Sequence, residues 1–342
     1  MTDDHAVMSH IMNTLPSLSQ LKNLAILLPH SFVDPKASSM NGSDGYSMDS
    51  KSFSKLTHLS MKIPQEWTQT SLLERLNLSN LQSLQLSLYL NSPERCQRAA
   101  LNLSKIKYIK ALKLSIAYID QLQDILKLFF ESIAGMELLT SFRINLTPSS
   151  LFTAREQIPS DVLTILEKIL QKPMKIQDLS LECKELILSH EFRRLIEIFG
   201  ASASSFKRLK LDAAPLVLEQ ENIGPFIRFV EGLEHIRTLK LPCVEIDSNQ
   251  ILTRLTSALV NLKEIRSISL EKIGGEKVGE LVYLQSIERI LEKRGLQIFD
   301  CDMTDDLRKR LESVGAPLSL EKITKKNPFL KSVKLIILMI IH

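Results

Sequence analysis

The sequence is poor in the residue types that mark several specialised classes of protein. Only 6% of its 342 residues are aromatic, with a single tryptophan. The formal net charge of +4 is mildly basic, far from the composition of a dedicated nucleic-acid-binding domain. Proteins that bind single-stranded nucleic acid combine a dense basic groove with stacking aromatic side chains. We therefore expect no nucleic-acid partner.

The motifs of common catalytic and metal-binding sites are also missing. Gly274-Gly275-Glu276-Lys277 lacks the frame of a phosphate-binding loop, and His190-Glu191 is not followed by a second histidine at the metalloprotease spacing. No two cysteines have the spacing of zinc ligands. Function depends on sites, and none of these is visible, so we expect a non-enzymatic protein without a cofactor or a bound metal.

Targeting and membrane signals are missing as well. The acidic N-terminus has no apolar signal core. The apolar run at 335–341 falls far short of the ~20 residues that span a bilayer. We interpret it as a terminal strand or an apolar contact of a cap, with a mobile tail as the alternative. We expect no membrane span and a cytoplasmic protein, with the nucleus as the alternative compartment. The glycosylation sequons at Asn41, Asn77, Asn102 and Asn145 are then chance matches.

What the sequence does contain is a motif of the form L-x-x-L-x-L that recurs roughly every thirty residues. Its clearest copy is Leu81-x-x-Leu84-x-Leu86. A fixed period of this kind indicates one structural unit stacked on copies of itself. The copies begin at Leu21, Leu56, Leu81, Ile109, Leu139, Ile176, Phe206, Ile236 and Ile265.

Each repeat opens with the alternation of a strand and continues with helical spacing. Leu112 and Leu114 share one face of a strand, while Lys113 lies on the other. Helical periodicity follows at 119–133, 162–170, 192–199, 251–262 and 278–291. Ser160-Asp161 and Asp247-Ser248 are typical of helix N-caps. Parallel strands need a crossover of about a dozen residues, usually a helix, so the pattern predicts an α/β fold with an inner parallel sheet and outer helices.

This pattern resembles the leucine-rich repeat superfamily, in its long-repeat, helix-backed class typified by ribonuclease inhibitor. The likeness covers about residues 18–300. The Asn or Cys that usually follows the strand in this family is mostly missing, and Cys183 and Cys243 lie one position early. The resemblance implies a solenoid, or horseshoe, that presents the concave face of its sheet to other molecules.

The cysteines favour a reducing compartment. Cys183 and Cys243 occupy the same inward-facing position in repeats that are two apart. Strands two apart are separated by about 10 Å, which is too far for a disulfide. We expect buried free thiols.

Three regions follow from the repeats. We expect an N-terminal cap at 1–20, a solenoid of about nine to ten repeats at 21–300, and a C-terminal cap with an apolar tail at 301–342. A Ser-rich loop near 33–52 interrupts the solenoid. This loop is either a solvated insertion or a phosphorylated or partner-binding segment.

The outward strand positions define the candidate site. The middle position of each strand forms a row across the sheet, which we call the central row, and no acidic residue is expected in it. Neighbouring strands lie about 4.8 Å apart, so Lys113 repels Arg143 and Lys210 repels Lys240. The central row reads Ser60, Gln85, Lys113, Arg143, Ser180, Lys210, Lys240 and Ser269.

Two interpretations of this row remain open. The basic residues, with Arg208 beside them, would receive an acidic surface of a protein partner. Alternatively, the face is solvated and partly balanced by Asp178, Glu182 and Asp212.

We expect a non-enzymatic scaffold for protein–protein interaction that binds its partner through the concave face. One alternative is a substrate-recognition adaptor of the ubiquitin-ligase type, and another is a regulator of an enzyme such as a small GTPase. The sequence leaves the partner's identity and the oligomeric state open.

Overall fold

The computed structural model describes two compact units, one within Met1–Thr153 and one within Ala154–His342. The described residues are 21–27, 55–62, 80–90, 93–118, 122–148, 156–157, 160–172, 175–182, 186–187, 192–212, 216–218, 220–242, 244–246, 248–274, 277–303, 327 and 332–335. The expected cap at 1–20 and the Ser-rich loop lie outside them. Most of the expected C-terminal cap and the apolar tail beyond Leu335 also lie outside them.

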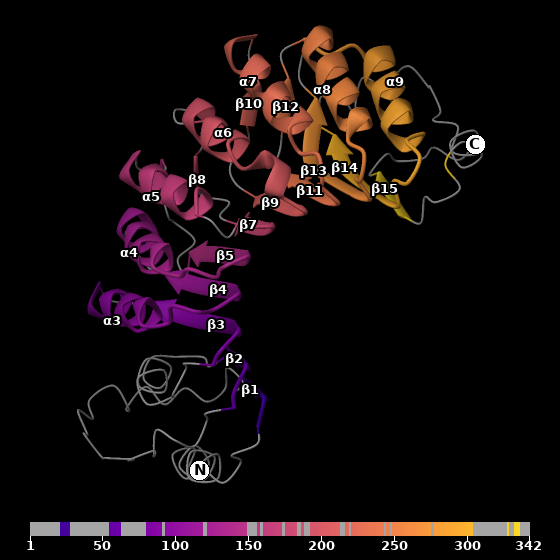
Figure 1. Cartoon of the computed structure of the whole chain (residues 1–342). Helices are drawn as coiled ribbons and strands as arrows, with labels where there is room; N and C mark the ends of the chain where they lie inside the picture. Colours follow the sequence, from indigo (N-terminus) through magenta and orange to yellow (C-terminus); the bar gives the residue numbers. More distant parts are fainter. Residues whose placement is uncertain are drawn as a thin grey trace, which may run out of the picture. The chain divides into compact units, whose positions relative to one another are not determined.

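The first unit is a layer of parallel strands with helices on one side (Figure 1). Each strand pairs in register with the next, so Leu84 lies beside Leu112 and Leu112 beside Phe142. Its elements are β1 (Asn23–Leu27), β2 (His58–Lys62), β3 (Ser83–Leu90), α3 (Pro93–Ser104), β4 (Ala111–Tyr118), α4 (Leu122–Ala134) and β5 (Ser141–Pro148).

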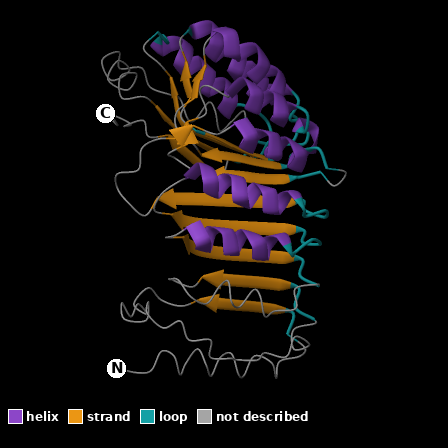
Figure 2. Cartoon of the chain, turned by 90° about the vertical axis from the view of Figure 1, so that its left-hand side faces the viewer, coloured by secondary structure: helices purple, strands orange, loops and turns teal. Residues whose placement is uncertain are grey.

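The second unit repeats the same strand–helix alternation. Figure 2 shows that within each unit the helices cover one face of the strands. Its longer elements are α5 (Ser160–Leu170), β7 (Asp178–Glu182), α6 (Phe192–Gly200), β9 (Arg208–Asp212), α7 (Gln220–Glu231), β11 (Thr238–Leu241), α8 (Asn249–Asn261), β13 (Ser267–Gly274), α9 (Glu280–Leu291), β14 (Ile298–Met303) and β15 (Ser332–Leu335). Every pairing between described strands is parallel, so the chain is an α/β protein whose parallel strands alternate with helices.

Short second strands follow several main strands of the second unit. β12 (Val244–Ile246) comes just after β11, and Pro242 lies in the break between them. A proline has no N–H to donate to a strand neighbour, so it favours an interruption there. β11 pairs with the first half of β13, while β12 pairs with its end. The other short strands are β6 (Glu156–Gln157), β8 (Leu186–Ile187) and β10 (Leu216–Leu218).

The core lies between the strands and the helices. Leu86, Leu114 and Ile144 occupy matching positions of three strands, and all are at most 1% exposed. Phenylalanines add edge contacts, as between Phe130 and Phe142, whose ring centroids lie 5.9 Å apart. Full burial of such a side chain contributes roughly 1.5–3 kcal/mol, so each repeat is held chiefly by contact with its neighbours.

Polar side chains cap the helix ends of the preceding repeat. The Oγ of Ser132 donates to the carbonyl of Ala100 at 2.8 Å, and the Nζ of Lys293 donates to the carbonyl of Val260 at 2.6 Å. Burial lowers the pKa of Lys293. Val260 lies in the last turn of α8, where a helix leaves carbonyls without an intrahelical partner.

The strands of the repeats and the five helices predicted from periodicity are present. Ser248 is confirmed as the N-cap of α8, because its Oγ accepts a hydrogen bond from the backbone N–H of Ile251. Two helices, α3 and α7, were not foreseen by the periodicity analysis. In the part of the chain that the structure describes, no helix is both long and apolar enough to cross a membrane.

Candidate functional site: the exposed face of the strands

The strand face opposite the helices, which we call the sheet face, carries the central row. In the first unit Ser60 lies beside Gln85, Gln85 beside Lys113, and Lys113 beside Arg143. Their inward neighbours on the same strands are buried, which confirms the predicted alternation. The register thus brings two basic side chains to adjacent strands.

The second unit continues the row with a different charge pattern. Ser180 lies beside Lys210, Lys210 beside Lys240, and Lys240 beside Ser269. The next position, on β14, is Asp300. The eight residues predicted for the row include no acidic residue, and β14 extends the row by one position that is acidic.

Ion pairs neutralise much of the positive charge in the second unit. The Oδ2 of Asp212, on β9, forms an ion pair with the Nζ of Lys240 on the neighbouring strand β11. Arg208 and Asp178, in register on adjacent strands, lie 3.8 Å apart. Asp178 and Asp212, which we expected to balance part of the basic charge, thus contact basic residues directly.

Three positions of the sheet face are less accessible than the alternation predicted. Ser180 is 1% exposed and donates its hydroxyl to the Oε1 of Glu182 at 2.8 Å. Asp212 is 7% exposed, and its Oδ1 has no hydrogen-bond partner. Pro242 is buried at the break between β11 and β12. The basic residues Arg208, Lys210 and Lys240 of this unit remain partly exposed.

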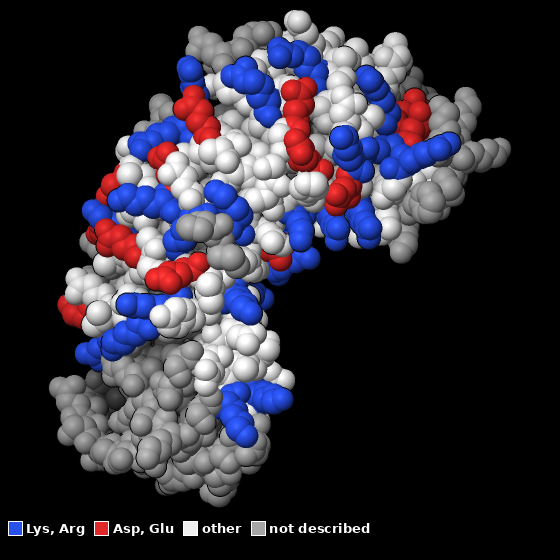
Figure 3. All heavy atoms as spheres, viewed as in Figure 1, with Lys and Arg blue, Asp and Glu red and all other residues white. Residues whose placement is uncertain are grey.

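Lys113 and Lys210 differ from the paired residues. Lys113 is exposed on β4, and the side chains in register beside it are Gln85 and Arg143. Neither lysine forms an ion pair within 4 Å among the described residues. Figure 3 shows blue side chains over the strand side of the second unit with red ones among them. Lys113 and Lys210 are therefore the lysines of the central row that form no ion pair among the described residues.

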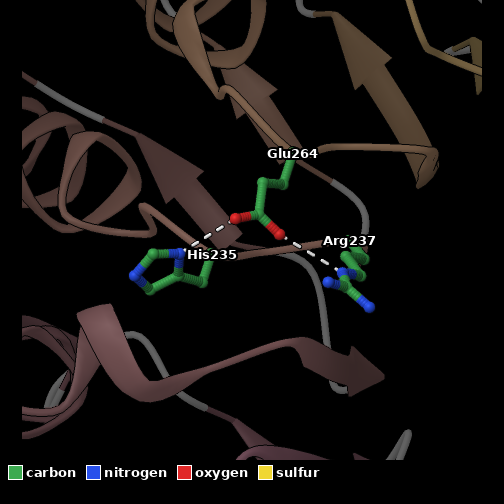
Figure 4. Close-up of polar contacts among 3 residues, drawn as sticks. All are labelled: His235, Arg237 and Glu264. Carbon is green, nitrogen blue, oxygen red and sulfur yellow. Dashed lines mark hydrogen bonds and ion pairs between the residues drawn. The ribbon is translucent and has the colours of Figure 1, made fainter.

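A polar cluster that sequence reasoning missed lies just before β11 and β13. His235 Nδ1 lies 3.0 Å from the Oε1 of Glu264, and the Nε of Arg237 donates to its Oε2 at 3.2 Å (Figure 4). The hydrogen bonds from His235 and then Arg237 lower the pKa of Glu264. The repeat spacing could have predicted this cluster, because the residues precede strands that are one repeat apart, and side chains on neighbouring strands lie close together. All three are well exposed, and the arrangement joins two repeats rather than enclosing a reaction site.

The cysteines and metal-ligand residues show no assembled site in the described ranges. Cys96 and Cys301 are buried and take part in no disulfide, and burial raises the pKa of Cys96. Cys183 and Cys243 lie outside the described residues. Among the residues described, no group of three or more His, Cys, Asp or Glu side chains could hold a metal ion.

The repeat geometry of strand, crossover helix and exposed sheet face is the property by which this chain can be compared with others. The sequence matches no protein-family model and no curated protein.

Proposed function

We propose that this chain is a leucine-rich repeat solenoid of the helix-backed class and a non-enzymatic scaffold that binds a protein partner through its sheet face. One observation carries the proposal: helices cover one face of the strands in each unit, and polar side chains in register occupy the other. An array of this kind supplies the extended surface that a protein interface of about 800 Å² per partner requires.

A recurring backbone contact supports the repeat assignment. The carbonyl of the residue before one strand accepts two N–H groups from the next repeat. Lys110 receives them from Thr140 and Ser141, and Arg237 from Arg266 and Ser267. The same contact recurs at Lys22, Thr57, Gln82, Gln177, Lys207 and Arg266. Identical contacts in successive units are what a stack of one structural unit produces.

The exposed Lys113 supports a partner contact on the first unit. Lys113 and Arg143 lie side by side, and their neighbours in register on β3, β4 and β5 carry no acidic group. The corresponding residues of the second unit pair with Asp178 and Asp212. An acidic segment of a partner gains most beside a basic side chain that forms no ion pair, which among the described residues is true of Lys113. The adaptor and enzyme-regulator roles both use such a face, and the identity of the partner decides between them.

The test is capture of partners by variants with reversed charge. The double variant Lys113→Glu/Arg143→Glu is compared with wild type by quantitative affinity purification and mass spectrometry. The matched control, Arg98→Glu/Lys107→Glu, reverses two exposed charges on α3 and the loop after it. Any protein lost from the first variant is then titrated against purified chains.

We expect the sheet-face variant to bind that protein at least about tenfold more weakly, a change of roughly 1.4 kcal/mol. The control should bind like wild type. Equal capture by all three proteins contradicts the proposal.

A further inference from the structure

A groove on the helix side of the second unit lies between α7 and α8, away from the sheet face. Its cavity volume is about 300 Å³. It is lined by Gly224, Ile227, Arg228 and Glu231 of α7 and by Thr253, Arg254 and Ser257 of α8. The volume is at the lower end of the ~300–1,000 Å³ typical of ligand sites, and the lining is mainly polar and charged.

The groove has an excess of guanidinium groups. Arg228 and Arg254 are exposed on facing helices, and neither forms an ion pair within 4 Å with another described residue. A third guanidinium lies at the edge, where the Nη1 of Arg289 on α9 donates to the Oγ of Ser257 at 3.3 Å. Glu231 is the one carboxylate among the lining residues. The balance of charge favours an anion.

The hydroxyl groups of the groove do not compete as donors. Thr253 donates to the carbonyl of Asn249, and Ser257 donates to the carbonyl of Thr253, each at 2.9 Å. The donors left for a ligand are therefore those of the arginines. Guanidinium forks match the oxygens of a phosphoryl group better than a compact ammonium does, because they donate two parallel hydrogen bonds.

Gly224 keeps the groove open beside Arg228. A Cβ at position 224 would meet one atom within 4 Å, the Nη1 of Arg228 at 3.7 Å, which is ordinary van der Waals contact. Alanine would thus fit, although glycine inside a helix costs about 1 kcal/mol relative to alanine. Packing therefore does not require glycine at this position.

We propose that the groove between α7 and α8 binds a phosphorylated serine or threonine side chain of a peptide segment from a protein partner. Arg228 and Arg254 hold the phosphoryl oxygens, and the open side of the groove admits the peptide backbone. No aromatic residue lines the groove, so a nucleobase has nothing to stack on. The site does not depend on the function proposed for the sheet face.

The test uses an oriented library of phosphoserine peptides and the same library with unphosphorylated serine, passed over the immobilised full chain. We expect wild type to retain the phosphorylated library at least tenfold more strongly. Arg228→Gln/Arg254→Gln should abolish this preference. Gly224→Leu, which keeps both arginines but fills the groove, should abolish it as well.

The control is Arg193→Gln, because Arg193 lies on α6, outside the groove, and is 72% exposed. This variant should retain the wild-type preference. Melting temperatures of all the variants show whether each is folded. Equal retention of the two libraries by wild type, or an undiminished preference in either groove variant, overturns the proposal.

Discussion

At the scale of single residues, charge neutralisation distinguishes the two units. Lys240 is paired with Asp212, whose side chain is only 10% exposed, whereas Lys113 is exposed and has no ion-pair partner among the described residues. The alternation of the sequence placed all three on one strand face, and that placement is correct. It could not show which lysine is paired, because a pairing between strands depends on the three-dimensional direction of both side chains.

Lys240→Met should lower the free energy of unfolding by about 2 kcal/mol, because it leaves a nearly buried carboxylate without its counter-charge. Lys113→Met, the matched control, should change it by less than about 0.5 kcal/mol. Urea unfolding followed by circular dichroism measures both. Adding Asp212→Asn to Lys240→Met should recover more than half of the loss. If the two single variants cost the same, the pair contributes nothing to stability.

The cluster at Glu264 predicts a pH-dependent contribution to stability. Its pKa is lowered in the folded protein from the ordinary value of 4.5, so its contacts stabilise the fold above that pH. The stabilisation is lost as the pH falls through the lowered value. The melting temperature of wild type should therefore exceed that of Glu264→Gln at pH 6, and the difference should be smaller near pH 3. A difference in melting temperature that is the same at both pH values would contradict this account.

At the scale of elements, the sequence predicted some helices and missed others. The helices with long apolar side chains at regular spacing were predicted, but α3 and α7 were not. The apolar stripe of α3 consists largely of small residues such as Cys96, Ala99 and Ala100, which give a weak periodic signal. In α7, Gly224 and Pro225 oppose a helix, yet Phe226 and Val230 are fully buried against the neighbouring repeats. Tertiary packing there outweighs local propensity.

Ser248→Ala tests the capping of α8. Loss of an N-cap hydroxyl costs about 1 kcal/mol, and the backbone N–H of Ile251 loses its acceptor. The control Thr253→Ala removes an exposed hydroxyl that bonds only to its own helix, so its effect should stay within about 0.5 kcal/mol. Hydrogen exchange should accelerate at the first turn of α8 in Ser248→Ala alone. Unchanged exchange at that turn would show that the cap is dispensable.

At the scale of the whole molecule, the period of the sequence predicted the parallel strands, their register and the burial of one face. It did not predict the short second strands or Asp300 in the central row. The break between β11 and β12 lies at Pro242, next to Cys243, which the sequence shows one position early. The geometry of such a turn is not readable from a hydrophobic pattern. The partner cannot be read from one chain either, because complementarity is a property of two surfaces.

The most direct test of the central claim is site-specific photo-crosslinking in cells. A photoreactive amino acid replaces Lys113 or Lys210 on the sheet face, and Glu131 on α4 or Glu197 on α6 for the helix side. The account predicts that a partner is crosslinked from a sheet-face position and from neither helix position. Crosslinking from the helix positions alone would contradict it.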